Sequence, residues 1–181
     1  MLVARFATRR SAAAAALAAC AAIATIVAVP TAARAGTPAC SASSLVVWLD
    51  TQGNGAAGSS FYNLQFTNLS RSSCQLSGYP GVSAVDLGGR QLGHAGSRDA
   101  AHPAVAVTLP AGGSAHTILR IVDAGNFPRS ACGPVTAAGL RVYPPGQTAS
   151  KLIPYPFAAC SRNTATVLSV EVLQKGLGVT Q

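Results

Sequence analysis

The chain has 181 residues, of which 49% are hydrophobic and only 10% are charged. Four of its 13 basic residues lie within positions 1–35, and the other nine are scattered singly against 5 acidic residues. A nucleic-acid-binding protein gathers its basic residues on one face or along one helix, so this distribution argues against that function class. We therefore expect no nucleic acid among the partners.

Positions 1–35 have the three parts of a secretory signal peptide. Three arginines precede an apolar run from Ala12 to Val29, which is followed by Ala33-Arg34-Ala35. A charged segment, an apolar segment and a small-residue A-x-A site are typical of an export signal that is removed from the protein. We predict cleavage between Ala35 and Gly36.

A second interpretation of this leader stays open. Leu17-Ala18-Ala19-Cys20 has the form of a lipoprotein processing site, at which Cys20 would become the lipid-anchored first residue. Residues 21–29 continue the apolar run, whereas a lipoprotein usually opens with a polar tether, so we favour cleavage after Ala35. Residues 36–181 are the size of one domain. We expect this domain to be secreted or attached to the cell envelope, monomeric, and without a membrane span.

Short strands with a period of two are predicted along the rest of the chain. Leu45–Leu49 is an apolar run bounded by turn-forming residues, which is typical of a well covered strand. Tyr62–Thr67 alternates apolar and polar side chains, as a strand with one buried face does. Further strands are predicted at Val105–Leu109, Ala115–Ile121, Leu140–Tyr143 and Leu168–Val172.

Turn-forming residues separate these strands at regular intervals. Glycine, proline, asparagine and serine gather at 53–59, 88–89, 110–113 and 144–146. No stretch keeps the apolar spacing of three and four residues that a helix needs. Short strands between such turns predict an all-β fold, an immunoglobulin-like antiparallel β-sandwich that comprises residues 36–181.

The four cysteines after the leader predict two disulfides, because an even number in an exported chain usually pairs. Two antiparallel strands bring together residues placed symmetrically about their turn. Cys40 and Cys74 are symmetric about the turn between the first two strands. Cys132 and Cys160 are symmetric about the Pro-Pro-Gly turn. We therefore predict the pairs Cys40–Cys74 and Cys132–Cys160, with no metal bound to these cysteines, since no CxxC motif occurs.

Several blocks of the sequence resemble a known protein family. They are NLQFTN (63–68), CQLSGYPGV (74–82), PAGGSA (110–115) and LRVYPP (140–145). Together they resemble the domain-of-unknown-function family 4232 of actinobacterial exported proteins over about residues 40–173. The resemblance implies an exported or lipid-anchored envelope protein with a β-sandwich fold. It brings no catalytic residues to transfer to this chain.

Within the second block, Gly78-Tyr79-Pro80-Gly81 is expected to form a rigid corner. Proline fixes one φ, and the glycines on either side permit positive φ. Tyr79 would cover the edge of the core while its hydroxyl stays in water. A platform for a ligand is the alternative role for this ring.

The inventory of residues for catalysis is poor. The five acidic residues form no local pair, and neither a G-x-S-x-G nor an H-E-x-x-H motif occurs. Ser114 and His116 would lie about 7 Å apart on one face of a strand, beyond hydrogen-bond reach. We therefore expect a non-catalytic protein without a cofactor. The alternative is an exported hydrolase whose site is assembled from residues distant in sequence.

Gly88–Pro103 is the longest polar stretch and our candidate contact surface. The residues expected to meet an anionic envelope polymer are Arg90, His94, Arg98 and His102. A mobile connector is the competing interpretation of this segment. His94, Asp99 and His102 also raise a zinc or copper hypothesis, although their spacing matches no standard ligand motif. The predicted function is binding of an unidentified envelope polymer or protein.

Overall fold

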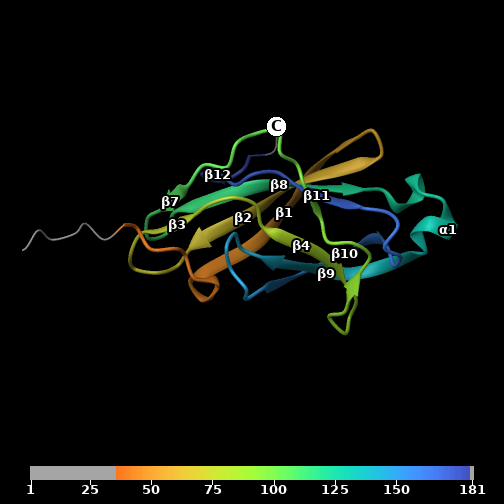
Figure 1. Ribbon diagram of the computed structural model, residues 1–181, viewed down its shortest axis with the longest axis horizontal. Helices are drawn as coiled ribbons and strands as arrows, with labels where there is room; N and C mark the ends of the chain where they lie inside the picture. Colours follow the sequence, from red (N-terminus) through yellow and green to blue (C-terminus); the bar gives the residue numbers. More distant parts are fainter. Residues whose placement is uncertain (1–35, 180–181) are drawn as a thin grey trace, which may run out of the picture. The chain divides into compact units, whose positions relative to one another are not determined.

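The computed structural model describes residues 36–179, and most of the regular structure in this range is β-strand (Figure 1). The described residues include one α-helix, α1 (Arg129–Cys132), and it has a single turn. None of the helices in this range has the length and hydrophobicity that crossing a membrane requires. The predicted signal peptide, with Ala35 and the alternative lipid site Cys20, lies outside the described residues.

Within residues 36–179 the strands form three sheets. The six-stranded sheet has the order β1 (Leu45–Ala56), β2 (Ser59–Asn68), β8 (Ser114–Val122), β11 (Leu168–Val170) and β6 (Ser97–Arg98), with β12 (Gln174–Lys175) also on β8. The four-stranded sheet has the order β10 (Lys151–Cys160), β9 (Pro134–Tyr143), β4 (Gly81–Val85) and β5 (Gln91–Leu92). The two-stranded sheet pairs β3 (Cys74–Leu76) with β7 (Val107–Leu109). Two short 3₁₀ helices, η1 (Ala42–Ser44) and η2 (Ala124–Asn126), lie between strands.

The predicted alternation is clearest in β8. Ala115, Thr117 and Leu119 are completely buried, whereas His116 and Arg120 point to the other face and stay partly or fully exposed. Successive side chains of a strand point to opposite faces, so this pattern places one face of β8 on the core.

The first strand differs from its prediction. β1 continues through the predicted glycine turn, and the chain reverses at Ala57 and Gly58, whose φ values are 48° and 71°. Two consecutive positive φ values are the pattern of a two-residue hairpin turn. The expectation of a well covered strand is wrong, because β1 lies at the edge of its sheet and leaves Val46 and Trp48 about 40% exposed.

The purely antiparallel plan is also wrong at one strand. β5 pairs with β4 in the four-stranded sheet, but β6 pairs in parallel with β11 in the six-stranded sheet. The segment between them therefore crosses from one sheet to the other. The Gly96 N–H donates a 2.7 Å hydrogen bond to the Val82 carbonyl on the way. Polar composition alone gave no sign of this crossing.

Both predicted disulfides are present, Cys40–Cys74 and Cys132–Cys160, with Cα–Cα distances of 4.8 and 4.6 Å. The first closes the open end of the β1–β2 hairpin, and the second closes the open end of the β9–β10 hairpin. This is the place that symmetric spacing about the two turns predicted.

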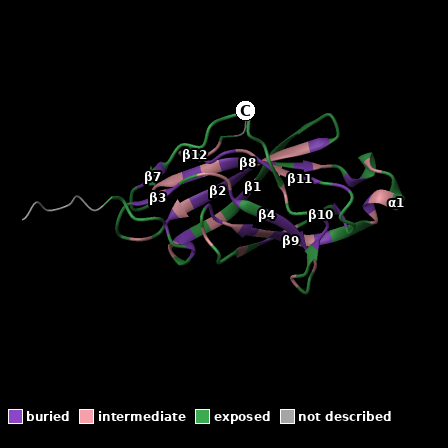
Figure 2. Cartoon of the chain, in the orientation of Figure 1, coloured by how far each residue is buried: buried purple, intermediate pink, exposed green. Residues whose placement is uncertain are grey.

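One buried cluster connects the sheets. It includes Phe66 and Leu119 from the six-stranded sheet, and Val82 and Leu140 from the four-stranded sheet. Strand β1 contacts β10, and β11 contacts β4. Figure 2 shows the buried residues along the strands and mostly exposed residues in the connecting segments. The two larger sheets therefore share one core, and connecting segments are left to form surface sites.

Candidate functional site

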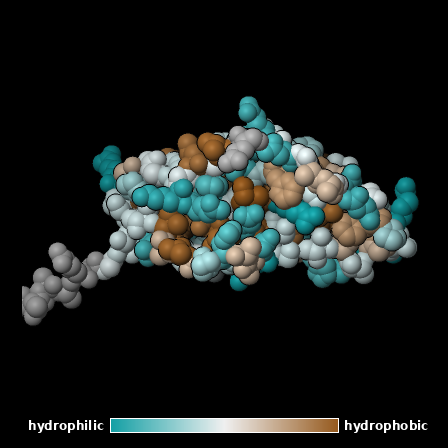
Figure 3. Space-filling model, turned by 90° about the horizontal axis from the view of Figure 1, so that it is seen from above, coloured by the Kyte–Doolittle hydropathy of each residue, from teal (hydrophilic) through white to brown (hydrophobic). Residues whose placement is uncertain are grey.

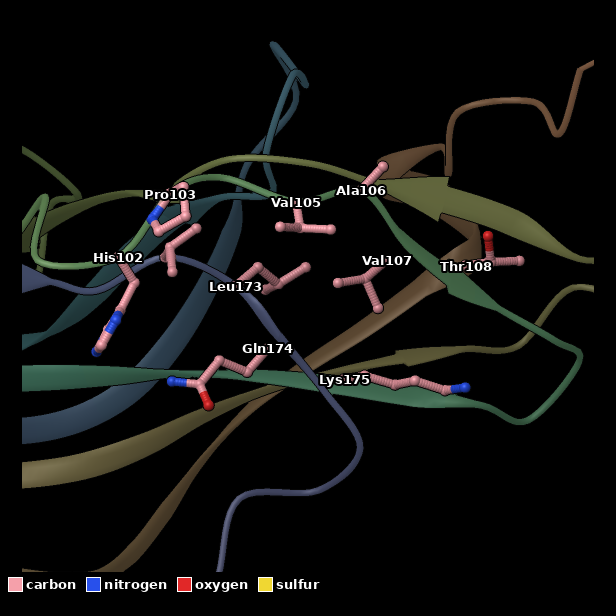
Figure 4. A pocket seen from close by; sticks show the side chains of 10 residues that line it. His102, Pro103, Val105, Ala106, Val107, Thr108, Leu173, Gln174 and Lys175 are labelled. Carbon is pink, nitrogen blue, oxygen red and sulfur yellow. The ribbon is translucent and has the colours of Figure 1, made fainter.

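A hollow of about 700 Å³ lies between two segments that are distant in sequence (Figure 4). The first segment, 102–108, enters β7, and the second, 172–175, enters and includes β12. Pairing of β7 with β3 holds the first segment, and pairing of β12 with β8 holds the second. Two different sheets thus position the two walls.

The lining of the hollow is largely aliphatic. Val107, Val172 and Leu173 are buried, whereas Val105 is 64% exposed. On the face shown in Figure 3, apolar side chains form small patches separated by hydrophilic residues, so no single apolar surface covers that face. An apolar group that enters the hollow would remove Val105 from water, and such burial is favourable by roughly 25 cal/mol per Å².

Basic side chains accompany this aliphatic lining. His102 lies towards one end of the hollow and Lys175 farther along it (Figure 4). Among the described residues that line the hollow, none is acidic. Lys175 brings its ammonium group to the lining, so the hollow combines an apolar interior with positive charge.

The predicted corner at Tyr79 connects the two walls. The Tyr79 hydroxyl donates to the His102 carbonyl at 3.3 Å, and the Leu173 N–H donates to the Gly78 carbonyl at 3.1 Å. Gly78 has a φ of 97°, which a residue with a Cβ rarely adopts. Gly81, at which positive φ was permitted, instead begins β4 in extended conformation.

The structure brings Arg98 and His102 to this corner. The Arg98 guanidinium lies 5.7 Å from the centroid of the Tyr79 ring, within cation–π range. His94 lies in the segment between β5 and β6, and Arg90 lies in the turn between β4 and β5. Of the four predicted contact residues, Arg98 and His102 are thus joined through Tyr79.

Arg90 is engaged within its own turn. Its backbone N–H donates to Asp86 Oδ1 at 2.8 Å, and its Nε lies 3.1 Å from Oδ2. The backbone hydrogen bond from Arg90 is the largest effect and lowers the pKa of the Asp86 carboxyl. Desolvation opposes it, and the charge of Arg90 lowers the pKa further, so that the pKa lies below its usual value. A ligand would have to compete with this carboxylate for Arg90.

The structure does not assemble the hypothetical metal site. Within residues 36–179, no group of three or more His, Cys, Asp or Glu side chains could hold a metal ion. His94, Asp99 and His102 are therefore not brought together. Asp99 Oδ1 instead accepts a 3.1 Å hydrogen bond from the Ala101 N–H. This is a local turn contact.

Ser114 and His116 also have separate partners. The Ser114 hydroxyl hydrogen-bonds with the Thr67 hydroxyl at 2.9 Å, and His116 Nδ1 lies 3.0 Å from the Gly176 carbonyl oxygen. These contacts point the two side chains to different neighbours. They do not form a nucleophile–base pair in this structure.

An aromatic group that sequence reasoning missed borders a second hollow of about 480 Å³. The rings of Tyr62 on β2 and Tyr155 on β10 meet edge to face with centroids 5.3 Å apart, and Phe157 stacks beside Tyr155. The Tyr155 hydroxyl donates to the Tyr62 hydroxyl at 2.5 Å. Burial, and then this hydrogen bond, raise the pKa of Tyr155 to about 12.

Fold and site together define a β-rich domain with two disulfides and an open hollow lined by aliphatic and basic side chains. The chain belongs to the family described as Domain of unknown function (DUF4232), which it matches over residues 40–173. No curated protein and no solved structure matches the chain. The disulfides are consistent with a domain that lies outside the cytoplasm.

Proposed function

We propose that the protein is an exported, non-catalytic binding domain of the cell envelope or extracellular space. In this proposal a signal peptide is removed before Gly36, and the two larger sheets form an immunoglobulin-like sandwich. The two disulfides support export, because such bonds persist in oxidising compartments. Membership of an uncharacterised family supplies no activity, so the ligand class is argued from the hollow alone.

The ligand we propose is an anionic envelope molecule that carries an apolar group. One observation supports it: the hollow between segments 102–108 and 172–175 combines aliphatic residues with His102 and Lys175, and its described lining has no carboxylate. An acyl or similar chain would lie against Val105 and its neighbours. The anionic group would lie near Lys175, where the local charge favours it.

Three small probes test this ligand class by calorimetry. Decanoate has an apolar chain and a charge, decanol has the chain alone, and acetate has the charge alone. We expect saturable binding of decanoate, weaker binding of decanol and no measurable binding of acetate. Equal binding of decanoate and decanol would remove the anionic part of the proposal, and no saturable binding of either would overturn it entirely.

The two lysines of residues 36–181 provide a matched pair of variants. Lys175→Gln removes the charge at the hollow, whereas Lys151→Gln removes a charge on β10 that does not line it. An exposed charge pair contributes about 0.2–1 kcal/mol, so Lys175→Gln should weaken decanoate binding by a factor of about 1.4 to 5. Lys151→Gln should leave it unchanged. Equal effects of the two variants would place the anion elsewhere.

A further inference from the structure

The C-terminal tail, residues 176–179, covers a buried glutamine on the six-stranded sheet. Gln65 on β2 is only 1% exposed, although its position between Leu64 and Phe66 places it on the face away from the core. Its Nε2 donates to the Gly178 carbonyl at 3.1 Å, and its Oε1 accepts from the Gly178 N–H at 3.2 Å. The side-chain amide therefore satisfies both backbone groups of one tail residue, as a neighbouring strand would.

Strand β8 supplies a second pair of contacts to the tail. His116 is the cross-strand neighbour of Gln65, and its Nδ1 lies 3.0 Å from the Gly176 carbonyl oxygen. The Gly176 N–H donates to the Ser114 carbonyl at 2.9 Å. All four contacts involve backbone groups of Gly176 and Gly178, so the sheet recognises the backbone of the tail and not particular side chains.

Close approach explains why the tail residue above Gln65 is glycine. A Cβ at Gly178 would lie 2.8 Å from His116 Cδ2 and closer still to the side-chain amide of Asn63. The side chains on either side of it, Leu177 and Val179, are 57% and 76% exposed. The sheet surface thus excludes a side chain at one position and leaves its neighbours free.

We propose that Asn63, Gln65 and His116 form a peptide-binding slot for a segment with two glycines separated by one residue, as Gly176 and Gly178 are in the tail. The slot lies within the residues that match the family, whereas the tail lies beyond residue 173, where the match ends. The tail is thus a tethered occupant of a site on the family domain. The partner is a protein that presents a segment with the same two glycines, which replaces the tail through the same backbone contacts. This proposal does not depend on the ligand of the hollow.

The test uses the full chain with Gly178→Ala, which should release the tail because the added methyl group has no room. The probe is a peptide with the sequence of residues 174–179, QKGLGV, and the readout is the side-chain amide signal of Gln65 in ¹⁵N NMR spectra. We expect a saturable shift in the variant. The wild-type chain should need at least about ten times more peptide, because its tethered tail competes at a high effective concentration.

Two controls separate slot binding from general effects. A peptide with alanine in place of its second glycine should not shift the Gln65 signal, and a chain with Val179→Ala should behave like wild type because that side chain is exposed. If Gly178→Ala alone leaves the tail in place, Gly176→Pro/Gly178→Ala removes the Gly176 N–H donor as well.

Three results would overturn the proposal. The first is an opened slot whose Gln65 signal does not respond to the peptide. The second is an equal response to the alanine peptide, which would mean that the slot does not require glycine at the position of Gly178. The third is self-association of the wild-type chain that the peptide reverses, because the occupant would then be the tail of a second copy and not a partner protein.

Discussion

The hydroxyl groups of Tyr62 and Tyr155 join the two larger sheets at a point where both rings are half-buried. The contact needs the proton of Tyr155, since its hydroxyl is the donor and that of Tyr62 accepts. Ionisation would cost Tyr155 this hydrogen bond and leave a phenolate in a partly dehydrated position. Both effects favour the neutral form, and so the pKa of Tyr155 rises to about 12.

This pair predicts a loss of stability at alkaline pH. The unfolded chain ionises its tyrosines near pH 10, whereas folded Tyr155 keeps its proton until about pH 12. The contribution of neutral Tyr155 to the free energy of unfolding is fully present below pH 10 and is lost as the pH rises through 12. Tyr155→Phe should lower the free energy of unfolding at neutral pH by about 1 kcal/mol and make its alkaline decline shallower. Urea unfolding at a series of pH values measures the free energy of unfolding at neutral pH and its decline at alkaline pH. An identical decline in the wild type and in Tyr155→Phe would show that Tyr155 is not the group responsible.

At the scale of strands, sequence alternation predicted the faces of β8 but not the burial of Gln65 on β2. The cover over Gln65 comes from a residue 113 positions later in the chain, and no local pattern records such a contact. Strand β10 was missed for a different reason, because Pro154 and Pro156 indicate a break. The structure places β10 at a sheet edge with a register shift after Pro154, where a missing N–H is tolerated.

The position of β3 gives a prediction for the hollow. Cys40–Cys74 fixes β3, and β3 in turn pairs with β7, which supplies Val107 and Thr108 to the lining. Replacing both of these cysteines with serine should loosen β7 and weaken decanoate binding severalfold, because a less rigid site holds its ligand less well. Calorimetry under conditions in which the variant is still folded measures the effect.

The matched control removes the other disulfide. Cys132 is the last residue of α1, and in Figure 1 this helix lies on the side of the domain opposite to β3 and β7. Serine at both of these positions should reduce stability without changing affinity for decanoate. An equal loss of affinity in the two variants would show that the disulfides act only through global stability.

At the scale of the whole molecule, the disulfides were predictable and the hollow was not. Pairing of cysteines about a turn follows from the antiparallel hairpin, which is a rule of local sequence. The hollow instead requires two segments, 102–108 and 172–175, that different sheets bring together. The sequence led to the prediction of His102 and Arg98 as contact residues because they are polar residues in a polar stretch. Nothing in the sequence indicated the aliphatic wall at Val172 and Leu173, because two apolar residues there are also typical of a buried core.

We expect the domain to need at least one of its two disulfides to stay folded at 37 °C. They close loops with sequence separations of 34 and 28 residues, each worth about 3.5–4 kcal/mol by chain entropy. Their combined contribution, about 7–8 kcal/mol if they act independently, is comparable to the 5–15 kcal/mol that stabilises a typical domain. Serine at one pair should therefore leave a folded but less stable protein, whereas serine at all four cysteines should leave it largely unfolded at 37 °C. Circular dichroism melting of the wild type, the two double variants and the quadruple variant tests this order. A quadruple variant that melts with the wild type would mean that the shared core between the sheets is sufficient for folding without the disulfides.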